Sequence, residues 1–597
     1  MQAATNSVRE VLTRQLRFVI PTYQRDYEWT QDEQWELLFD DLFSTASRLH
    51  EARAGDAVAG TSKLVDSLSP HFLGAVVFEQ LKTSTSAIAA RSVIDGQQRI
   101  TTLQLLVRGL LDALEGTGSK KAAALRSLIW NPADLCEEDH ERFKLWPRLR
   151  DRRTWMSVMD DAPTDLQHPY ADARRYFHDA ASTAAAELPL DVIVDALLTL
   201  FHLVVIDLDA NDDAQVIFEV LNGRQTPLSA ADLMKNLLFL REDIQNEAML
   251  EKLYTQYWQE FDNDWWRKRT GRGHAQRGRR EQLISAWLTV SQGAEVNIGH
   301  LYGAARTYLS DPNLGTDQVL AELHTYGQHF RSLYERTGAE ATVGELRLRR
   351  ILDVLGVTTA IPLLLWLKML PSSRLSAAEY DECVSTIEGW LVRRAIMNWS
   401  SRSYGKVFLE VLSKLQASSE STDPIPGLLL EILRNKPGNL DFPTDEEFSN
   451  VLTGTALYKQ SKPRVRMILA GLDEHMRTRE TRHEQYVVKY DKLQIEHVMP
   501  QAWATNWPLP SAKQSETATA ARNSAIQTLG NLTLLTQKLN GEQSNKGWDE
   551  KRDLLETHSS LLISKSLHKS KSWSENDIER RGRALAEMAC QIWKGPN

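Results

Sequence analysis

The chain has 597 residues, 42% of them hydrophobic and 25% charged, which is typical of a globular protein and too long for one hydrophobic core. A net charge of −9 excludes a uniformly basic surface, so any nucleic-acid site must be a local patch. Three widely spaced cysteines exclude a disulfide framework and a Cys-x-x-Cys zinc site. No apolar run reaches membrane-spanning length and the first residues lack a signal region, so we expect a cytoplasmic protein with no membrane partner.

The N-terminal third alternates expected strands and helices. Residues 18–20 read as a short strand that ends at a proline, and residues 72–78 and 92–94 as the two strands of a hairpin. Thr30 and Glu33 have the spacing of a capping box, which predicts a helix start, and the polar residues 51–70 read as a loop. Residues 201–208 are rich in β-branched side chains and predict a buried strand.

A polar run, Asp95-Gly96-Gln97-Gln98-Arg99, joins the second hairpin strand to a long amphipathic helix. Asp95 can cap this helix with Gln98 reaching back, which is a purely structural interpretation. A helix N-terminus with a carboxylate and an arginine is equally typical of a site for phosphate and metal. The pattern by itself leaves both interpretations open.

Two acidic segments follow the strand at 201–208. Residues 209–213 are Asp-Ala-Asn-Asp-Asp, which we interpret as a helix N-terminus with favourable carboxylates rather than as a metal site. Ser229 and Asp232 predict another capping box. Lys235 lies one helical turn further on, where it could reach a phosphate.

Residues 241–415 predict a series of helices, interrupted by a basic loop at 267–280. Seven of these fourteen residues are Arg or Lys and none is acidic, opposite in sign to the whole chain. A charged run is commonly just a solvated loop, but flexible arginines can also follow a phosphate backbone. We expect Arg277, Arg279 and Arg280 to contact nucleic acid. Residues 418–424 are rich in serine and predict a linker.

The C-terminal region carries a pattern suited to phosphodiester hydrolysis. A short apolar strand runs into Glu496-His497 and stops at Pro500, and Asn531 and Asn540 follow it. A histidine can act as the base that deprotonates water, and carboxylate and amide oxygens suit Mg²⁺, which keeps several waters. The structural alternative is a buried histidine at a strand end, with asparagines as helix caps.

This C-terminal pattern resembles the HNH, or ββα-metal, nuclease motif. The resemblance implies that Glu496 and Asn540 are metal ligands for Mg²⁺ or Mn²⁺, that His497 is the general base and that Asn531 orients it. Glu496 stands where the family more often has Asp. We expect the nearby Lys546 to contact nucleic acid.

The N-terminal motifs resemble the DGQQR-motif domain of GmrSD-type modification-dependent restriction enzymes, which is related to ParB and sulfiredoxin folds. They are residues 20–29, 73–74, 95–99, 221–224 and 228–236. The phosphorothioate-sensing SspE proteins have the same two-part plan. The resemblance implies hydrolysis of a nucleoside triphosphate, GTP or ATP. Asp95 and Arg99 would be catalytic, Gly96, Gln97, Gln98, Arg99 and Lys235 would bind the nucleotide, and Tyr23, Gln24 and Arg25 would meet nucleotide or modified DNA.

The resulting expectation is a predominantly helical α+β protein with three domains. These are a ParB/sulfiredoxin-like α/β domain at 1–240, a helical connecting domain at 241–417 and an HNH nuclease domain at 418–597. The expected function is modification-dependent cleavage or nicking of double-stranded phage DNA, gated by nucleotide hydrolysis. A DNA-binding regulator with an inactive HNH domain and an RNA-cleaving toxin remain alternatives. The modification read, the nucleotide used and the oligomeric state, with a homo-oligomer as one option, stay open.

Overall fold

The computed structural model describes residues 2–21, 24, 26–60, 62–81, 88–160, 166–208, 229–240, 247–270, 277–311, 313–335, 343–418, 422–479, 488–509 and 515–596. It is predominantly helical with small sheets, which confirms the expected α+β class. The chain divides into two compact units, Met1–Glu260 and Phe261–Asn597. Within the described ranges, no helix is long and apolar enough to cross a membrane.

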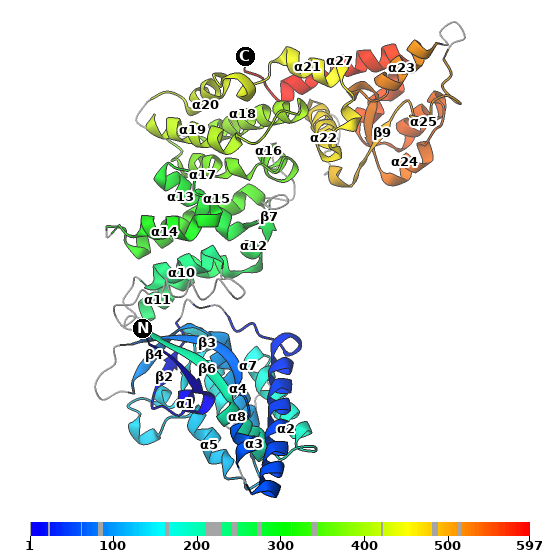
Figure 1. Cartoon of the computed structure of the whole chain (residues 1–597). Helices are drawn as coiled ribbons and strands as arrows, with labels where there is room; N and C mark the ends of the chain where they lie inside the picture. The colour runs from blue at the N-terminus through cyan, green and yellow to red at the C-terminus, as the bar shows by residue number, and fades with distance from the viewer. Residues whose placement is uncertain are drawn as a thin grey trace. The chain divides into compact units, whose positions relative to one another are not determined.

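A six-stranded mixed sheet forms the centre of the first unit (Figure 1). The strands predicted as a hairpin are antiparallel neighbours, and the buried strand predicted at 201–208 is parallel to the first of them. The strand predicted at 18–20 is also present, parallel to both of its neighbours. In spatial order the strands are β1 (Gln2–Ser7), β6 (Phe201–Leu208), β3 (His71–Gln80), β4 (Ala90–Asp95), β2 (Arg17–Val19) and β5 (Leu145–Trp146).

The helix that follows β4 is the central helix of this unit. Nearly all of α4 (Gln97–Leu114) is buried, including its polar Gln98, Thr102 and Arg108, so it is a core helix rather than a half-exposed one. It packs against α5 and α7. The helices of the unit are α1 (Val8–Leu12), α2 (Glu36–Ala59), α3 (Lys63–Asp66), α5 (Lys121–Ile129), α6 (Arg152–Met159), α7 (Pro169–Ala184), α8 (Leu190–Leu200), α10 (Ala230–Leu240) and α11 (Glu247–Leu253).

Two local predictions for α2 were wrong. The residues read as a polar loop continue the helix to Ala59 and then form α3, because Leu49, Ala52 and Asp56 maintain its buried face. The carboxylate of Asp56 accepts hydrogen bonds from the N–H groups of Leu64 and Val65 and so caps α3. At the N-terminal end, Gln34 rather than Glu33 reaches back to the N–H of Thr30, at 3.0 Å.

The second unit begins as a stack of helices (Figure 1). The basic segment adds a two-stranded ribbon of β7 (Arg269–Thr270) and β8 (Arg277–Gly278). The helices are α12 (Asp264–Arg267), α13 (Arg279–Gln292), α14 (Leu301–Leu309), α15 (Thr316–Tyr334), α16 (Val343–Arg349), α17 (Ile361–Met369), α18 (Ala377–Ile396), α19 (Tyr404–Ala417), α20 (Ile425–Arg434), α21 (Asp445–Gly454), α22 (Lys462–Arg479), α23 (Glu516–Ala525), α24 (Gln537–Gln543), α25 (Trp548–His558), α26 (Leu562–Lys565) and α27 (Glu575–Ile592).

The expected boundary at 417/418 does not separate compact units. Trp593, after the last helix, donates a hydrogen bond to Glu388 of α18 at 3.0 Å. Arg393, also on α18, donates to the carbonyl of Trp593 at 2.7 Å. The helical middle and the C-terminal region therefore share one core, and the first boundary lies at 260/261 rather than 240/241.

Candidate active sites

The polar run at 95–99 forms the junction between β4 and α4. Gly96 has φ of 84°, and a Cβ there would lie 2.7 Å from Cγ1 of Val76, so only glycine fits the turn. The carboxylate of Asp95 accepts the N–H of Gly96 at 2.7 Å. The N-cap position of α4 is Gly96 rather than Asp95, and the side chain of Gln98 bonds elsewhere, so the capping box predicted for Asp95 and Gln98 is not formed.

Gln98 instead holds the segment at residues 26–28. Its amide donates to the carbonyl of Asp26 at 2.7 Å and accepts from the N–H of Glu28 at 3.0 Å. Thr102, one turn further on, bonds the hydroxyl of Tyr27 at 2.7 Å. Both side chains are buried, so they are structural links between α4 and this segment.

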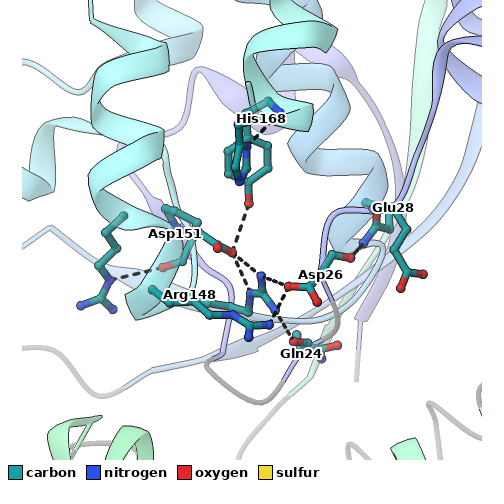
Figure 2. Close-up of polar contacts among 11 residues, drawn as sticks. Gln24, Asp26, Glu28, Arg148, Asp151 and His168 are labelled. Carbon is teal, nitrogen blue, oxygen red and sulfur yellow. Dashed lines mark hydrogen bonds and ion pairs between the residues drawn. The ribbon is translucent and has the colours of Figure 1, made fainter. Parts of the chain in front are cut away.

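Arg148 also binds this segment (Figure 2). Its guanidinium is 3% exposed, forms ion pairs with Asp26 and Asp151, and donates to the carbonyl of Gln24 at 3.0 Å. The side chain of Gln24 is buried and donates to the carbonyl of Ile94 at 3.2 Å. Gln24 is therefore not placed to meet nucleotide or DNA, and the prediction for this residue needs correction; Tyr23 and Arg25 lie outside the described residues.

Arg99 and Gln97 are the residues of the 95–99 run whose side chains have hydrogen-bonding atoms available for a ligand. Arg99 is half-buried beside Gly74, and its Nη1 donates to the carbonyl of Ala75 at 2.5 Å. Burial lowers the pKa of this guanidinium, and the charge of Asp95 opposes that shift. Oε1 of Gln97 is buried with no hydrogen-bond partner among the described residues. A guanidinium and backbone amides at one helix end can bind a phosphate group.

A two-stranded antiparallel sheet followed by a helix carries the C-terminal pattern. β9 (Gln494–His497) pairs antiparallel with β10 (Leu532–Leu535), so that His497 lies opposite Leu532 and Glu496 opposite Thr533. α24 follows directly, with Thr536 as its cap. At Gly530, just before β10, a Cβ would lie 1.9 Å from the carbonyl oxygen of Ile578 on α27, so the packing of this segment on α27 needs glycine there.

His497 is buried at the end of β9. Its ring lies 4.0 Å from that of Tyr458 between centroids, and its Nδ1 lies 3.5 Å from the amide of Gln501. Its Nε2 is buried and makes no hydrogen bond of standard geometry in the described part of the chain, although the side chain of Gln527 lies close enough to raise the pKa of the imidazole in part. Burial lowers the pKa of His497 to about 4, so the imidazole is neutral at pH 7, as a general base must be.

Glu496 has a partner that the sequence did not reveal. The ammonium of Lys551, on α25, lies 2.9 Å from Oε1 of Glu496 and donates to the carbonyl of His497 at 3.0 Å. The side chain of Lys551 is 0% exposed and that of Glu496 is 14% exposed. The lysine therefore fixes the carboxylate and the strand end together.

Asn531 braces the segment that follows the histidine. Its Oδ1 accepts from the N–H of Met499 at 2.8 Å and from Trp573 at 3.1 Å. Its Nδ2 donates to the carbonyls of Met499 and Ile526. Asn531 thus positions the chain after His497, rather than contacting the imidazole itself.

Asn540 is oriented toward β9 from α24. Its Nδ2 donates to the side chain of Gln494 at 2.8 Å, while its Oδ1 is buried with no described partner. Side chains two apart on a strand share a face, which places Glu496 on the face of β9 that Asn540 meets. No described cluster of three His, Cys, Asp or Glu could hold a metal. The carboxylate of Glu496 and the free amide oxygen of Asn540 fit Mg²⁺, which accepts few protein ligands.

Comparisons with known proteins match both regions. Residues 8–239 match a family model described as the GmrSD restriction endonuclease, N-terminal domain. Residues 442–588 match the one described as the GmrSD restriction endonucleases, C-terminal domain. The chain belongs to the GmrSD family of restriction endonucleases. A search of curated proteins found no match.

The GmrSD N-terminal match ends within α10, which carries another predicted nucleotide ligand. Lys235 is 3% exposed, and its ammonium lies 5.1 Å from the centroid of the Tyr254 ring. Leu233, on the same helix, packs against a cluster that includes Ile94 at the end of β4. The structure thus brings α10 beside the sheet near Asp95 but buries Lys235. The acidic segment at 209–213 and the motif at 221–224 lie outside the described residues.

The predicted basic loop lies between the two GmrSD matches and requires a correction. Arg279 and Arg280 begin α13 and are 8% and 5% exposed. Arg279 lies 4.0 Å from the centroid of the Trp265 ring, and Arg280 pairs with Asp262 at 2.8 Å. Their internal partners make both residues part of the core rather than a flexible contact for DNA. Arg277 is half-buried in β8, and residues 271–276 lie outside the described part of the chain.

Two residues of the candidate sites are not part of any sequence motif. Lys551 and Arg148 lie far along the chain from their partners Glu496 and Asp26, and no local spacing links them. Their only sequence signal was a cation in an otherwise amphipathic helix or turn. Lys546, which the motif did suggest, is 43% exposed and lies 3.6 Å from Glu550.

Proposed function

We propose that the C-terminal region is a metal-dependent HNH nuclease that nicks or cuts double-stranded DNA. The observation that carries this proposal is the pair of buried polar atoms on β9 and α24, Nε2 of His497 and Oδ1 of Asn540, that make no hydrogen bond of standard geometry in the described part of the chain. Leaving buried polar atoms unpaired costs about 1–3 kcal/mol each, so their retention favours a functional role. The family assignment supports DNA as the substrate.

The side chains have distinct roles in this proposal. Neutral His497 accepts a proton from the attacking water at Nε2. Glu496 and Asn540 hold Mg²⁺ or Mn²⁺, which when bound neutralises charge on the phosphate oxygens. Lys551 keeps Glu496 in place, and Asn531 keeps the segment after His497 in place.

Asn540→Ala tests the metal site. It should weaken divalent metal binding and slow plasmid nicking, and excess Mg²⁺ or Mn²⁺ should partly restore the rate, because only one ligand is lost. Asn450→Ala, an exposed substitution on α21, is the matched control. Equal metal dependence of the two variants would remove Asn540 from the site.

We further propose that the N-terminal region binds and hydrolyses a nucleoside triphosphate, GTP or ATP. The start of α4, with glycine at its N-cap, the guanidinium of Arg99 and the carboxylate of Asp95 support a phosphate site there. Gly96 and Gln97 complete the turn, while Gln98 acts through the segment that it holds. In this proposal hydrolysis gates the nuclease, and modified or phage DNA is the effector.

A further inference from the structure

A surface cavity of about 660 Å³ lies beside the proposed nuclease centre. It lies between the end of α18 and the turn that leads into α22, and its lining includes Asn398, Lys459, Gln460 and Arg464. The rim residue Lys459 directly follows Tyr458, whose ring packs on His497. Tyr458 therefore connects the two sites, because its ring contacts His497 and the next residue lines the cavity.

The cavity is cationic in a chain that is acidic. Its described lining residues include two cations and no carboxylate. The segment 459–466, Lys-Gln-Ser-Lys-Pro-Arg-Val-Arg, has four cations and no acid. The first turn of α22 likewise has no acidic residue, although a carboxylate would suit the helix dipole there. Positive charge is thus concentrated in residues 459–466, and none of these eight residues supplies a negative charge to balance it.

The lining also has polar atoms with capacity to spare and a strained turn. Nε of Arg464 and Oε1 of Gln460 are buried without hydrogen-bond partners in the described structure. Arg464 uses Nη1 to hold the carbonyl of Ala395 at 3.1 Å. Asn398 has φ of 55°, a left-handed conformation that is uncommon outside glycine and concentrates at functional sites.

We propose that this cavity binds a backbone phosphate of DNA through Lys459 and Arg464. The phosphate bound there is the neighbour of the phosphodiester that is cut. The inference rests on the proposed nuclease function and adds a substrate subsite to it. A guanidinium N–H and an ammonium suit phosphate oxygens, and a volume of this size accommodates a phosphate with its sugar. Contacts of this kind fix the register of the strand without reading its sequence.

The test is a binding measurement that needs no cleavage. Affinity for a short DNA duplex is measured in EDTA by fluorescence anisotropy across a series of salt concentrations. Replacing Lys459 and Arg464 together by Gln should lower affinity for all sequences and make the slope of log affinity against log salt shallower by about two. The control pair, Lys406→Gln with Arg434→Gln, removes the same charge from exposed positions on α19 and α20 and should leave the slope unchanged.

Two further variants keep the result interpretable. Lys459→Gln alone changes an exposed side chain and should reduce the slope by about one, and Arg464→Lys keeps the charge and should keep the slope. Slopes equal to that of the control pair overturn the proposal. Loss of GTP or ATP binding with an unchanged DNA slope also overturns it, because the cavity would then serve a free nucleotide. Failure of the nuclease proposal appears separately, as absent plasmid cleavage with the binding result intact.

Discussion

At the scale of single residues, the proposed nuclease centre depends on an ion pair that two distant parts of the chain form. Lys551 and Glu496 are both largely removed from solvent, so each charge is stable only beside the other. Burial lowers the pKa of Lys551, and Glu496 opposes that shift. The pair therefore connects the catalytic strand to α25.

Replacing Lys551 by Met should lower the free energy of unfolding by about 3 kcal/mol, because a carboxylate is left with little solvent and no counter-ion. Denaturant unfolding measures the loss. Lys565→Met, on the exposed surface of α26, should change stability by less than about 0.5 kcal/mol. Adding Glu496→Gln to Lys551→Met should recover part of the loss, and no recovery would contradict the pairing.

The sequence could predict the residues of this centre but not their partners. Glu496, His497, Asn531 and Asn540 were found because their order and spacing form a motif. Lys551 was not, because a contact across the fold leaves no periodic signal. Gln98 illustrates the opposite error, since its spacing fits a capping box but its side chain bonds the backbone of Asp26 and Glu28 instead.

At the scale of elements, strands were predicted better than helix limits. The apolar run at 72–78 and the β-branched run at 201–208 indicated β3 and β6 directly, since such residues suit a pleated, buried surface. The prediction of where α2 ends was wrong because small and polar residues can extend a helix when a buried face continues through them. The basic segment differs from a flexible loop because α13 begins at Arg279, where the arginines find partners inside the fold.

The first turn of α13 offers a test of that correction. Arg280→Gln should lower the free energy of unfolding by about 3 kcal/mol, because Asp262 loses its buried partner. The salt dependence of DNA binding by the Arg280→Gln variant should equal that of the wild-type protein. Arg277→Gln, three residues earlier in half-buried β8, should cost much less stability. Equal stability of the two variants would contradict a buried, stabilising ion pair for Arg280.

At the scale of the whole molecule, two compact units carry two different chemistries in this account. A nuclease that cuts freely would destroy its own cell, so we expect the first unit to control the second. A bound triphosphate can order loops and release them on hydrolysis. Gln24 and the segment 26–28, held by Arg148 and Gln98, lie between the proposed phosphate site and its surroundings.

Asp95→Ala and Arg99→Ala test this gate. Both should reduce triphosphate hydrolysis, since one removes a carboxylate and the other a phosphate ligand, and both should alter the preference between modified and unmodified plasmid. Because coupling in binding is reciprocal, nucleotide should also shift affinity for modified DNA. Arg126→Ala, on the exposed side of α5, serves as the control. Unchanged hydrolysis and unchanged selectivity would leave the 95–99 run as a structural turn.

The central claim is that His497 is the base of a DNA-cutting centre, and nicking of supercoiled plasmid in Mg²⁺ tests it most directly. His497→Ala should slow nicking by about a hundredfold or more while the folded state and DNA affinity are retained, because only the proton acceptor is lost. His558→Ala, exposed at the end of α25, should nick at the wild-type rate. A His497→Ala protein that nicks like the His558→Ala protein would contradict the account.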